Sequence, residues 1–106
     1  MNRNLSISCA LLLSLSFAAP ALAAGPAADL FQSKCAPCHG VDGLAATPAG
    51  KALKAASFKD PVVVNKPDAD LIAIVKSGKG KMPAWTGKLT DDQIKALVTH
   101  IRTLQK

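Results

Sequence analysis

The chain has 106 residues, which is the size of one domain, and a formal net charge of +6 from 13 basic and 7 acidic residues. Aromatic residues make up only 4% of the chain and it has 3 cysteines, so it cannot build a large aromatic core or a framework of several disulfides. The positive charge does not indicate a nucleic-acid partner, because no basic helix carries stacking aromatics.

The first segment, residues 1–23, has the pattern of an export signal. Arg3 supplies a positive charge, residues 5–19 form an apolar run with interspersed serines, and small alanines close the segment. We therefore expect a signal peptide that is cleaved after Ala23, followed by one domain, residues 24–106.

The alternative for this segment is an uncleaved membrane anchor, because residues 5–24 are nearly long enough to span a bilayer. A lipid anchor fits less well, since Cys9 lies near the start of the apolar run and not at the cleavage point. No second apolar span follows, and only Cys35 and Cys38 remain after cleavage. We expect a periplasmic protein with no stable membrane insertion.

Three later segments have the pattern of helices. Residues 27–35 follow a proline suited to a first helical turn, and residues 68–77 follow another proline and stop at a glycine. The last helix is expected to begin at Thr90, which with Gln93 forms a capping box. Its apolar stripe consists of Ile94, Leu97, Val98 and Ile101.

The segments between these helices are expected to be mainly loop. Glycine and proline punctuate residues 40–50, and a helical turn or two is expected around residues 51–56. The Pro-Val-Val-Val sequence at residues 61–64 is too short to indicate a strand. Because no segment alternates apolar and polar residues as a strand does, the sequence predicts an all-α domain.

The most informative motif is C-x-x-C-H, formed by Cys35, Cys38 and His39, the pattern of covalent haem attachment. Two thiols separated by two residues can add to the two vinyl groups of one porphyrin edge, and the next histidine can then bind the iron. We expect one haem c, joined by thioethers to Cys35 and Cys38, with His39 as an axial ligand of the iron. Such a cofactor would also supply core volume that the small domain lacks.

Other uses of the two cysteines are less well supported. A dithiol oxidoreductase would place them after a strand in a βαβ pattern, and no such strand precedes Cys35. A structural zinc site needs four ligands, and only His100 could join Cys35, Cys38 and His39 without carboxylates. A plain disulfide would leave the histidine unexplained.

Residues 27–104 resemble the class I c-type cytochromes, small electron carriers with one haem. Family members have a phenylalanine four residues before the first haem cysteine, as Phe31 stands before Cys35. Residues 82–85, Met-Pro-Ala followed by an aromatic, are similar to the segment that supplies the second axial ligand in photosynthetic and bacterial members. The resemblance implies a cytochrome c-like fold of about three main helices wrapped around one covalently bound haem, with Met82 as the other axial ligand.

The position of Met82 supports this role independently, since it is the only methionine after the signal and lies in a glycine-flanked loop. Ordinary core packing is the alternative for this side chain. His100 is a competing sixth ligand, which would lower the reduction potential. We expect His100 to pack against Phe31 instead, at a position where the family often has an aromatic.

Two further residues have open roles. Trp85 is expected either to pack against the haem edge or to fill the core. The resemblance implies that a proline carbonyl accepts a hydrogen bond from the second nitrogen of His39, which makes Pro48 a candidate, although it also fits a simple loop position.

An iron bound by histidine and methionine has no open coordination position, so it is suited to outer-sphere electron transfer and not to binding oxygen or peroxide. We therefore expect an electron carrier that is not an enzyme, with a positive midpoint potential. Three alternatives stay open. They are a haem-binding sensor or peroxidase-like protein with a labile sixth ligand, a haem subunit of a larger oxidoreductase, and a thiol-disulfide enzyme.

Charge predicts the kind of partner. Without Arg3 the chain has 12 basic and 7 acidic residues, a formal charge of +5. The resemblance implies an exposed haem edge beside five lysines: Lys34, Lys51, Lys79, Lys81 and Lys88. We expect a monomer whose basic face binds redox partner proteins with acidic docking faces. The alternative is that these lysines only keep the protein soluble.

Overall fold

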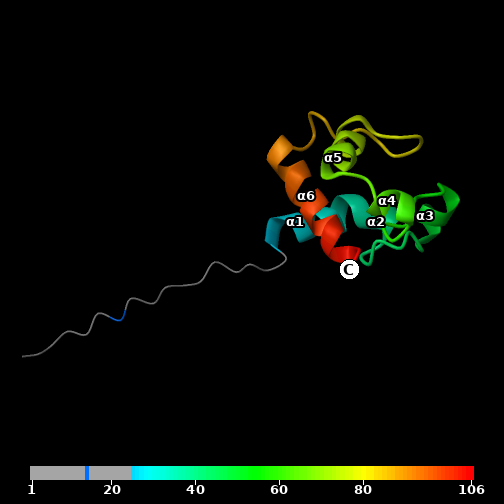
Figure 1. Cartoon of the computed structure of the whole chain (residues 1–106), viewed down its shortest axis with the longest axis horizontal. Coiled ribbons are helices and arrows are strands. Elements are labelled where there is room, and N and C mark those ends of the chain that lie inside the picture. Colours follow the sequence, from blue (N-terminus) through cyan, green and yellow to red (C-terminus); the bar gives the residue numbers. More distant parts are fainter. Residues whose placement is uncertain (1–13, 15–24) are drawn as a thin grey trace, which may run out of the picture.

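The computed structural model describes residue 14 and residues 25–106. The expected signal peptide, residues 1–23, lies outside the described residues apart from residue 14. The regular elements in the described part are helices: α1 (Gly25–Leu30), η1 (Phe31–Cys35), α2 (Ala36–His39), α3 (Pro48–Ala52), α4 (Pro61–Val64), α5 (Asp68–Ser77) and α6 (Asp91–Leu104) (Figure 1). This arrangement confirms the all-α prediction. None of these helices is both long enough and apolar enough to span a membrane.

The first helical stretch is longer than predicted and changes its winding. Elements α1, η1 and α2 follow one another without a break, and η1 is one turn of π-helix in which the Ala36 N–H donates to the Phe31 carbonyl. Phe31 and Ala36 are buried while Lys34, between them, is exposed. A wide turn of this kind is frequent at functional sites, and here it leads directly into the two cysteines.

Helix α5 has the predicted bounds, and helix α6 begins where it was predicted to begin. Helix α5 ends at Gly78, whose φ of +75° is a conformation that glycine adopts without strain. Helix α6 begins after Thr90 with a complete capping box. The Gln93 N–H donates to Thr90 Oγ1 (3.1 Å), and the Thr90 N–H donates to Gln93 Oε1 (2.8 Å).

Two short helices lie in the segment predicted to be mainly loop. Helix α3 begins at Pro48, earlier than predicted, because the Thr47 hydroxyl caps it by accepting from the Gly50 N–H (2.9 Å). Helix α4 contains three valines, which favour strands. It forms because Asp60 caps it, accepting from the Val62 N–H at 2.9 Å, and because proline occupies its first position.

The core lies where α6 packs across α1 (Figure 1). Its central cluster consists of Phe31, Ala36, Phe58, Leu97 and Ile101. Helix α5 also packs on α6, and its buried residues are Leu71 and Val75. Because Phe31 and Ala36 flank Cys35 in sequence, burial of the core also determines the position of the motif.

Arg102, near the end of α6, holds the connection between α4 and α5. Its guanidinium donates to Asp68 Oδ1 (2.8 Å), to the Val64 carbonyl (3.2 Å) and to the Lys66 carbonyl. It also donates to Gln105 Oε1 (2.9 Å). One side chain thus fixes a segment that is more than thirty residues away in the chain.

Candidate haem-binding site

The three residues of the C-x-x-C-H motif lie within two consecutive helical turns. Cys35 is the last residue of η1, and Cys38 and His39 lie in α2. Both cysteines are half-buried, and no disulfide joins them in the described part of the chain. Gly40, with a φ of +77°, ends α2 immediately after the histidine.

The His39 ring is held by a backbone carbonyl. Its Nδ1 lies 3.3 Å from the oxygen of Ala56. A carbonyl only accepts, so Nδ1 carries the proton and Nε2 keeps its lone pair. Burial lowers the pKa of His39, and the bond to Ala56 opposes this in part. A neutral imidazole with a free Nε2 is the form that binds a metal.

The acceptor of this bond differs from the prediction. Pro48 was the candidate, but it is the first residue of α3, and Ala56 provides the carbonyl. The prediction was wrong because any residue can present a backbone oxygen, and no side chain marks Ala56 in the sequence.

Phe58 supports the same ring from another side, and sequence reasoning missed it. Its ring stacks on His39 with the centroids 4.6 Å apart and the planes at 25°. Phe58 is itself buried in the core cluster, 5.9 Å from the ring of Phe31. The histidine therefore lies between the core and the surface, with one face covered by an aromatic ring.

Thr47 and Gly50 join α3 to the end of α2. The Thr47 hydroxyl lies within hydrogen-bonding distance of the carbonyls of Pro37 (2.8 Å) and Cys38 (3.0 Å), which have no partner further along the short helix. A Cβ at Gly50 would lie 2.2 Å from the Cys38 oxygen, so only glycine allows this approach. Sequence reasoning missed both contacts.

The thiol chemistry argues against a dithiol enzyme. Burial, together with the nearby Cys38, raises the pKa of the Cys35 thiol to about 11. A nucleophilic cysteine needs the opposite shift. The described part also has no strand before Cys35, and it contains no group of three or more His, Cys, Asp or Glu residues placed to bind a metal ion. The zinc alternative therefore has no support among residues 25–106.

Met82 lies on the loop between α5 and α6 and is half-buried. This loop extends away from α1 (Figure 1). Two backbone hydrogen bonds between Lys79 and Met82, at 2.9 Å and 3.2 Å, close a tight turn that ends at Met82. A Cβ at Gly78 would lie 2.6 Å from the Met82 oxygen, so this glycine allows the turn to pack against the end of α5. Axial ligation by Met82 stays a prediction.

Two other predicted residues have defined neighbours. The His100 ring packs on Phe31 with centroids 4.9 Å apart, as predicted. Trp85 is half-buried, and the Lys88 ammonium lies 5.6 Å from the centroid of its ring. This distance fits a cation–π contact. His100 is thus part of the crossing between α6 and the first helical stretch, which leaves Met82 as the better candidate for a sixth ligand.

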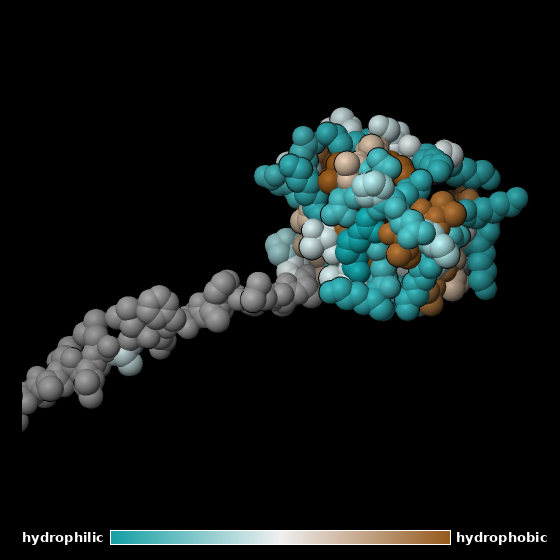
Figure 2. Space-filling view, in the orientation of Figure 1, coloured by the Kyte–Doolittle hydropathy of each residue, from teal (hydrophilic) through white to brown (hydrophobic). Residues whose placement is uncertain are grey.

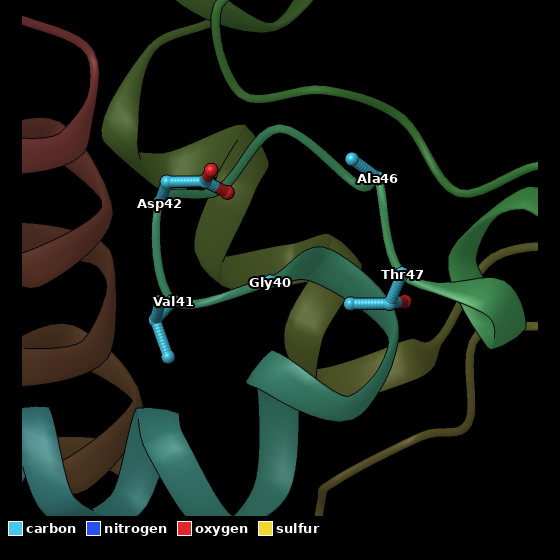
Figure 3. Close-up of a pocket in the computed structure, with 5 residues that line it drawn as sticks. All are labelled: Gly40, Val41, Asp42, Ala46 and Thr47. Atoms are coloured by element: carbon cyan, nitrogen blue, oxygen red, sulfur yellow. The ribbon is translucent and has the colours of Figure 1, made fainter.

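A shallow hollow of about 270 Å³ lies beside the motif (Figure 3). It is lined by Gly40, Val41, Asp42, Ala46 and Thr47. Neither cysteine nor the histidine lines it, and the Thr47 hydroxyl already contacts backbone carbonyls. We therefore place the candidate site at the motif and not in the hollow.

The residues at the motif fit a covalently bound haem. The donor set offers two thiols for thioether bonds and an imidazole whose Nε2 is free for iron. Large apolar side chains are also exposed in the segment after the motif and on α4: Val41, Leu44, Leu53, Val62 and Val64. Figure 2 shows part of this apolar surface as a brown patch over α4. Such side chains are suited to cover an apolar cofactor.

Comparisons with known proteins agree with this chemistry. The model of a family described as cytochrome c oxidase, cbb3-type, subunit III matches residues 23–101. Cytochrome c6 of Thermosynechococcus vestitus is 36% identical over 96 residues, which cover 91% of this chain and 83% of that protein. Cytochrome c6 of Euglena gracilis is 34% identical over 76 residues, or 72% of this chain and 86% of the relative. The solved structure of KustC0563 c-type cytochrome has a TM-score of 0.67 at 34% identity and covers 74% of this chain and 95% of its own.

The chain therefore belongs to the cytochrome c oxidase, cbb3-type, subunit III family of c-type cytochromes. Within this class it is a small class I c-type cytochrome. It binds haem c covalently and is an electron carrier that interacts with redox partners.

Proposed function

We propose that this protein is a periplasmic, monomeric electron carrier in which Cys35 and Cys38 hold the haem and His39 and Met82 are the axial ligands of the iron. The observation that carries the proposal is the state of His39. Its Nδ1 is held by the Ala56 carbonyl and burial lowers its pKa, so Nε2 is available to iron at neutral pH. The haem supplies the one-electron chemistry when bound.

The protein's own contribution is to hold the ligand and to limit access. The bond to Ala56 sets the tautomer of His39, and Phe58 covers one face of its ring. Ligation by both His39 and Met82 would leave no open position on the iron, which supports a carrier and not an enzyme.

An optical spectrum of the haem-loaded protein tests the ligand set. We expect sharp reduced bands and, in the oxidised protein, the weak band at the red end that reports methionine bound to iron. Met82→Ala should abolish that band, and His100→Ala should retain it. Loss of the band in His100→Ala only would overturn the assignment. Carbon monoxide binding by the wild-type protein at neutral pH would instead favour the sensor or peroxidase-like alternative.

We further propose that the docking face is basic and binds acidic partners. Four exposed lysines lie near the C-x-x-C-H motif or near the Met82 segment in sequence: Lys34, Lys79, Lys81 and Lys88. Opposite charges on the partner would raise the association rate at low salt. Charge reversal at Lys79 and Lys81 should lower the rate of electron transfer to an acidic partner severalfold at low salt. The same reversal at Lys95, exposed on α6, is the control.

Export can be tested on the protein itself. Mass spectrometry of protein recovered from the periplasm should give a chain that begins at Ala24 and carries one haem. A full-length chain retained in the membrane fraction would support the uncleaved anchor instead.

A second candidate function is that of a haem subunit in a larger oxidoreductase. The family description names an oxidase subunit, and this chain is 35% identical over 95 residues to the cbb3-type cytochrome c oxidase subunit FixP of Azorhizobium caulinodans. The match covers 86% of this chain but only 31% of FixP. Native mass measurement after gentle extraction distinguishes a free monomer from a subunit.

A further inference from the structure

Phe58 is the only side chain in the described structure whose ring stacks on the ring of His39. The two planes are nearly parallel, at 25°, and the centroids are 4.6 Å apart. The imidazole is thus restrained at its edge by the Ala56 carbonyl and on one face by Phe58. Together these contacts restrict both the rotation of the ring about its Cβ–Cγ bond and its tilt.

Phe58 is itself held firmly in place. Phe58 is 7% exposed, and its N–H donates to the Gly43 carbonyl (2.8 Å). Gly43 has a φ of +74°, and a Cβ there would lie 2.5 Å from the Phe58 ring, so glycine is needed for this close packing. On the other side, Gln105 Nε2 donates to the Phe58 carbonyl (3.0 Å).

The support continues through the end of α6. The Oε1 of Gln105 accepts a hydrogen bond from Arg102 Nη1 (2.9 Å). Arg102 also donates to Asp68 Oδ1 and to the carbonyls of Val64 and Lys66. A series of contacts therefore leads from Arg102 through Gln105 to Phe58. The Phe58 ring then contacts His39. Phe58 is thus held from two segments, the loop at Gly43 and the end of the chain at Gln105.

We propose that Phe58 is a positioning residue that sets the plane of the His39 imidazole and keeps water from one face of it. The inference rests on the proposed function, in which His39 is an axial ligand of the iron. Ligand orientation affects the electronic state of ferric iron, and exclusion of water favours the less charged ferrous state. Phe58 would thereby act on the iron through its contact with His39.

The test uses the haem-loaded protein and the variants Phe58→Leu, Phe58→Tyr and Phe58→Ala. The matched control is Phe31→Leu, because Phe31 belongs to the same buried cluster but packs on Phe58 and His100 and not on His39. Low-spin ferric EPR g values report the orientation of the axial imidazole. Equilibrium redox titration reports the ferric-to-ferrous balance, and thermal unfolding reports the structural cost of each substitution.

We expect Phe58→Leu to shift the g values, Phe58→Tyr to retain them because it keeps the ring, and Phe31→Leu to retain them despite a loss of stability. Phe58→Ala should also favour ferric iron by about tenfold, or about 59 mV for one electron. Equal spectral shifts in Phe58→Leu and Phe31→Leu, or unchanged g values in Phe58→Leu, would overturn the proposal. A wild-type spectrum without histidine ligation would overturn the proposed function instead, and this is decided before any variant is made.

Discussion

Replacement of Arg102 by alanine should destabilise the domain more than its single ion pair suggests. The guanidinium donates to Asp68 Oδ1, to Gln105 Oε1 and to the carbonyls of Val64 and Lys66. The Asp68 side chain is 64% exposed, so its pairing with Arg102 contributes only about 0–1 kcal/mol. The Arg102 side chain is 26% exposed. Its bonds to the Lys66 carbonyl and to Gln105 Oε1 are part-buried, so they are better protected than the exposed bonds to Asp68 and Val64.

The expected loss follows from these contacts. A hydrogen bond from a charged donor contributes about 1.5–3 kcal/mol where it is shielded, and less where water can replace the donor. Water can reach some of these acceptors after truncation, so we expect Arg102→Ala to cost about 2–3 kcal/mol in all. For a domain of this size, 1 kcal/mol corresponds to about 4–8 °C, and the melting temperature should fall by about 10–20 °C.

Thermal unfolding of the haem-loaded protein, followed by far-UV circular dichroism, measures this effect. Asp68→Asn is the control that removes only the ion pair, and it should lower the free energy of unfolding by less than about 1 kcal/mol. Arg102→Lys retains the charge but not the planar fork, so it should restore only part of the stability. If Asp68→Asn and Arg102→Ala destabilise the protein equally, the carbonyl contacts contribute nothing and the reasoning fails.

Two further predictions concern the surroundings of the motif. Gly50→Ala should cost at least about 1–3 kcal/mol in urea unfolding, because the new Cβ would lie 2.2 Å from the Cys38 oxygen, whereas Gly25→Ala, with no atom within 4 Å, should be nearly neutral. If both alanines have the same effect, the close approach of α3 to α2 is not what requires glycine at position 50. His39 should make stability depend on pH: its folded pKa is lowered, so the unfolded chain binds more protons, and stability present above about pH 6.5 is lost as the pH falls. Urea unfolding of the haem-free chain, in which no iron occupies His39, should show this loss between pH 7 and pH 5 in the wild type and a smaller one in His39→Gln; equal losses would assign the effect to other groups.

The sequence predicts best those features that depend on near neighbours in the chain. Helix α6 is marked by Thr90 and Gln93, three residues apart, and its start is as expected. The haem motif is equally local, because the spacing of the two vinyl groups of haem determines the spacing of the cysteines. The His100 contact with Phe31 was also predicted, but only through the resemblance to a family.

The features that were missed depend on distant residues or on the backbone. The acceptor for His39 Nδ1 is a carbonyl 17 residues away, and backbone oxygens look the same at every position of a sequence. Helix α4 was missed because three valines favour extended structure, while an Asp60 cap and a proline outweigh them over a single turn.

The two kinds of feature have different consequences for function. The local motif determines which cofactor the chain can bind, whereas the long-range contacts determine how firmly the ligand is held. Phe58, Gln105 and Arg102 come from two segments separated by about half the length of the described domain, yet they lie in one line of contacts that ends at His39. Relatives that share C-x-x-C-H but differ at these positions should therefore bind the same haem while differing in reduction potential and in the orientation of the axial imidazole.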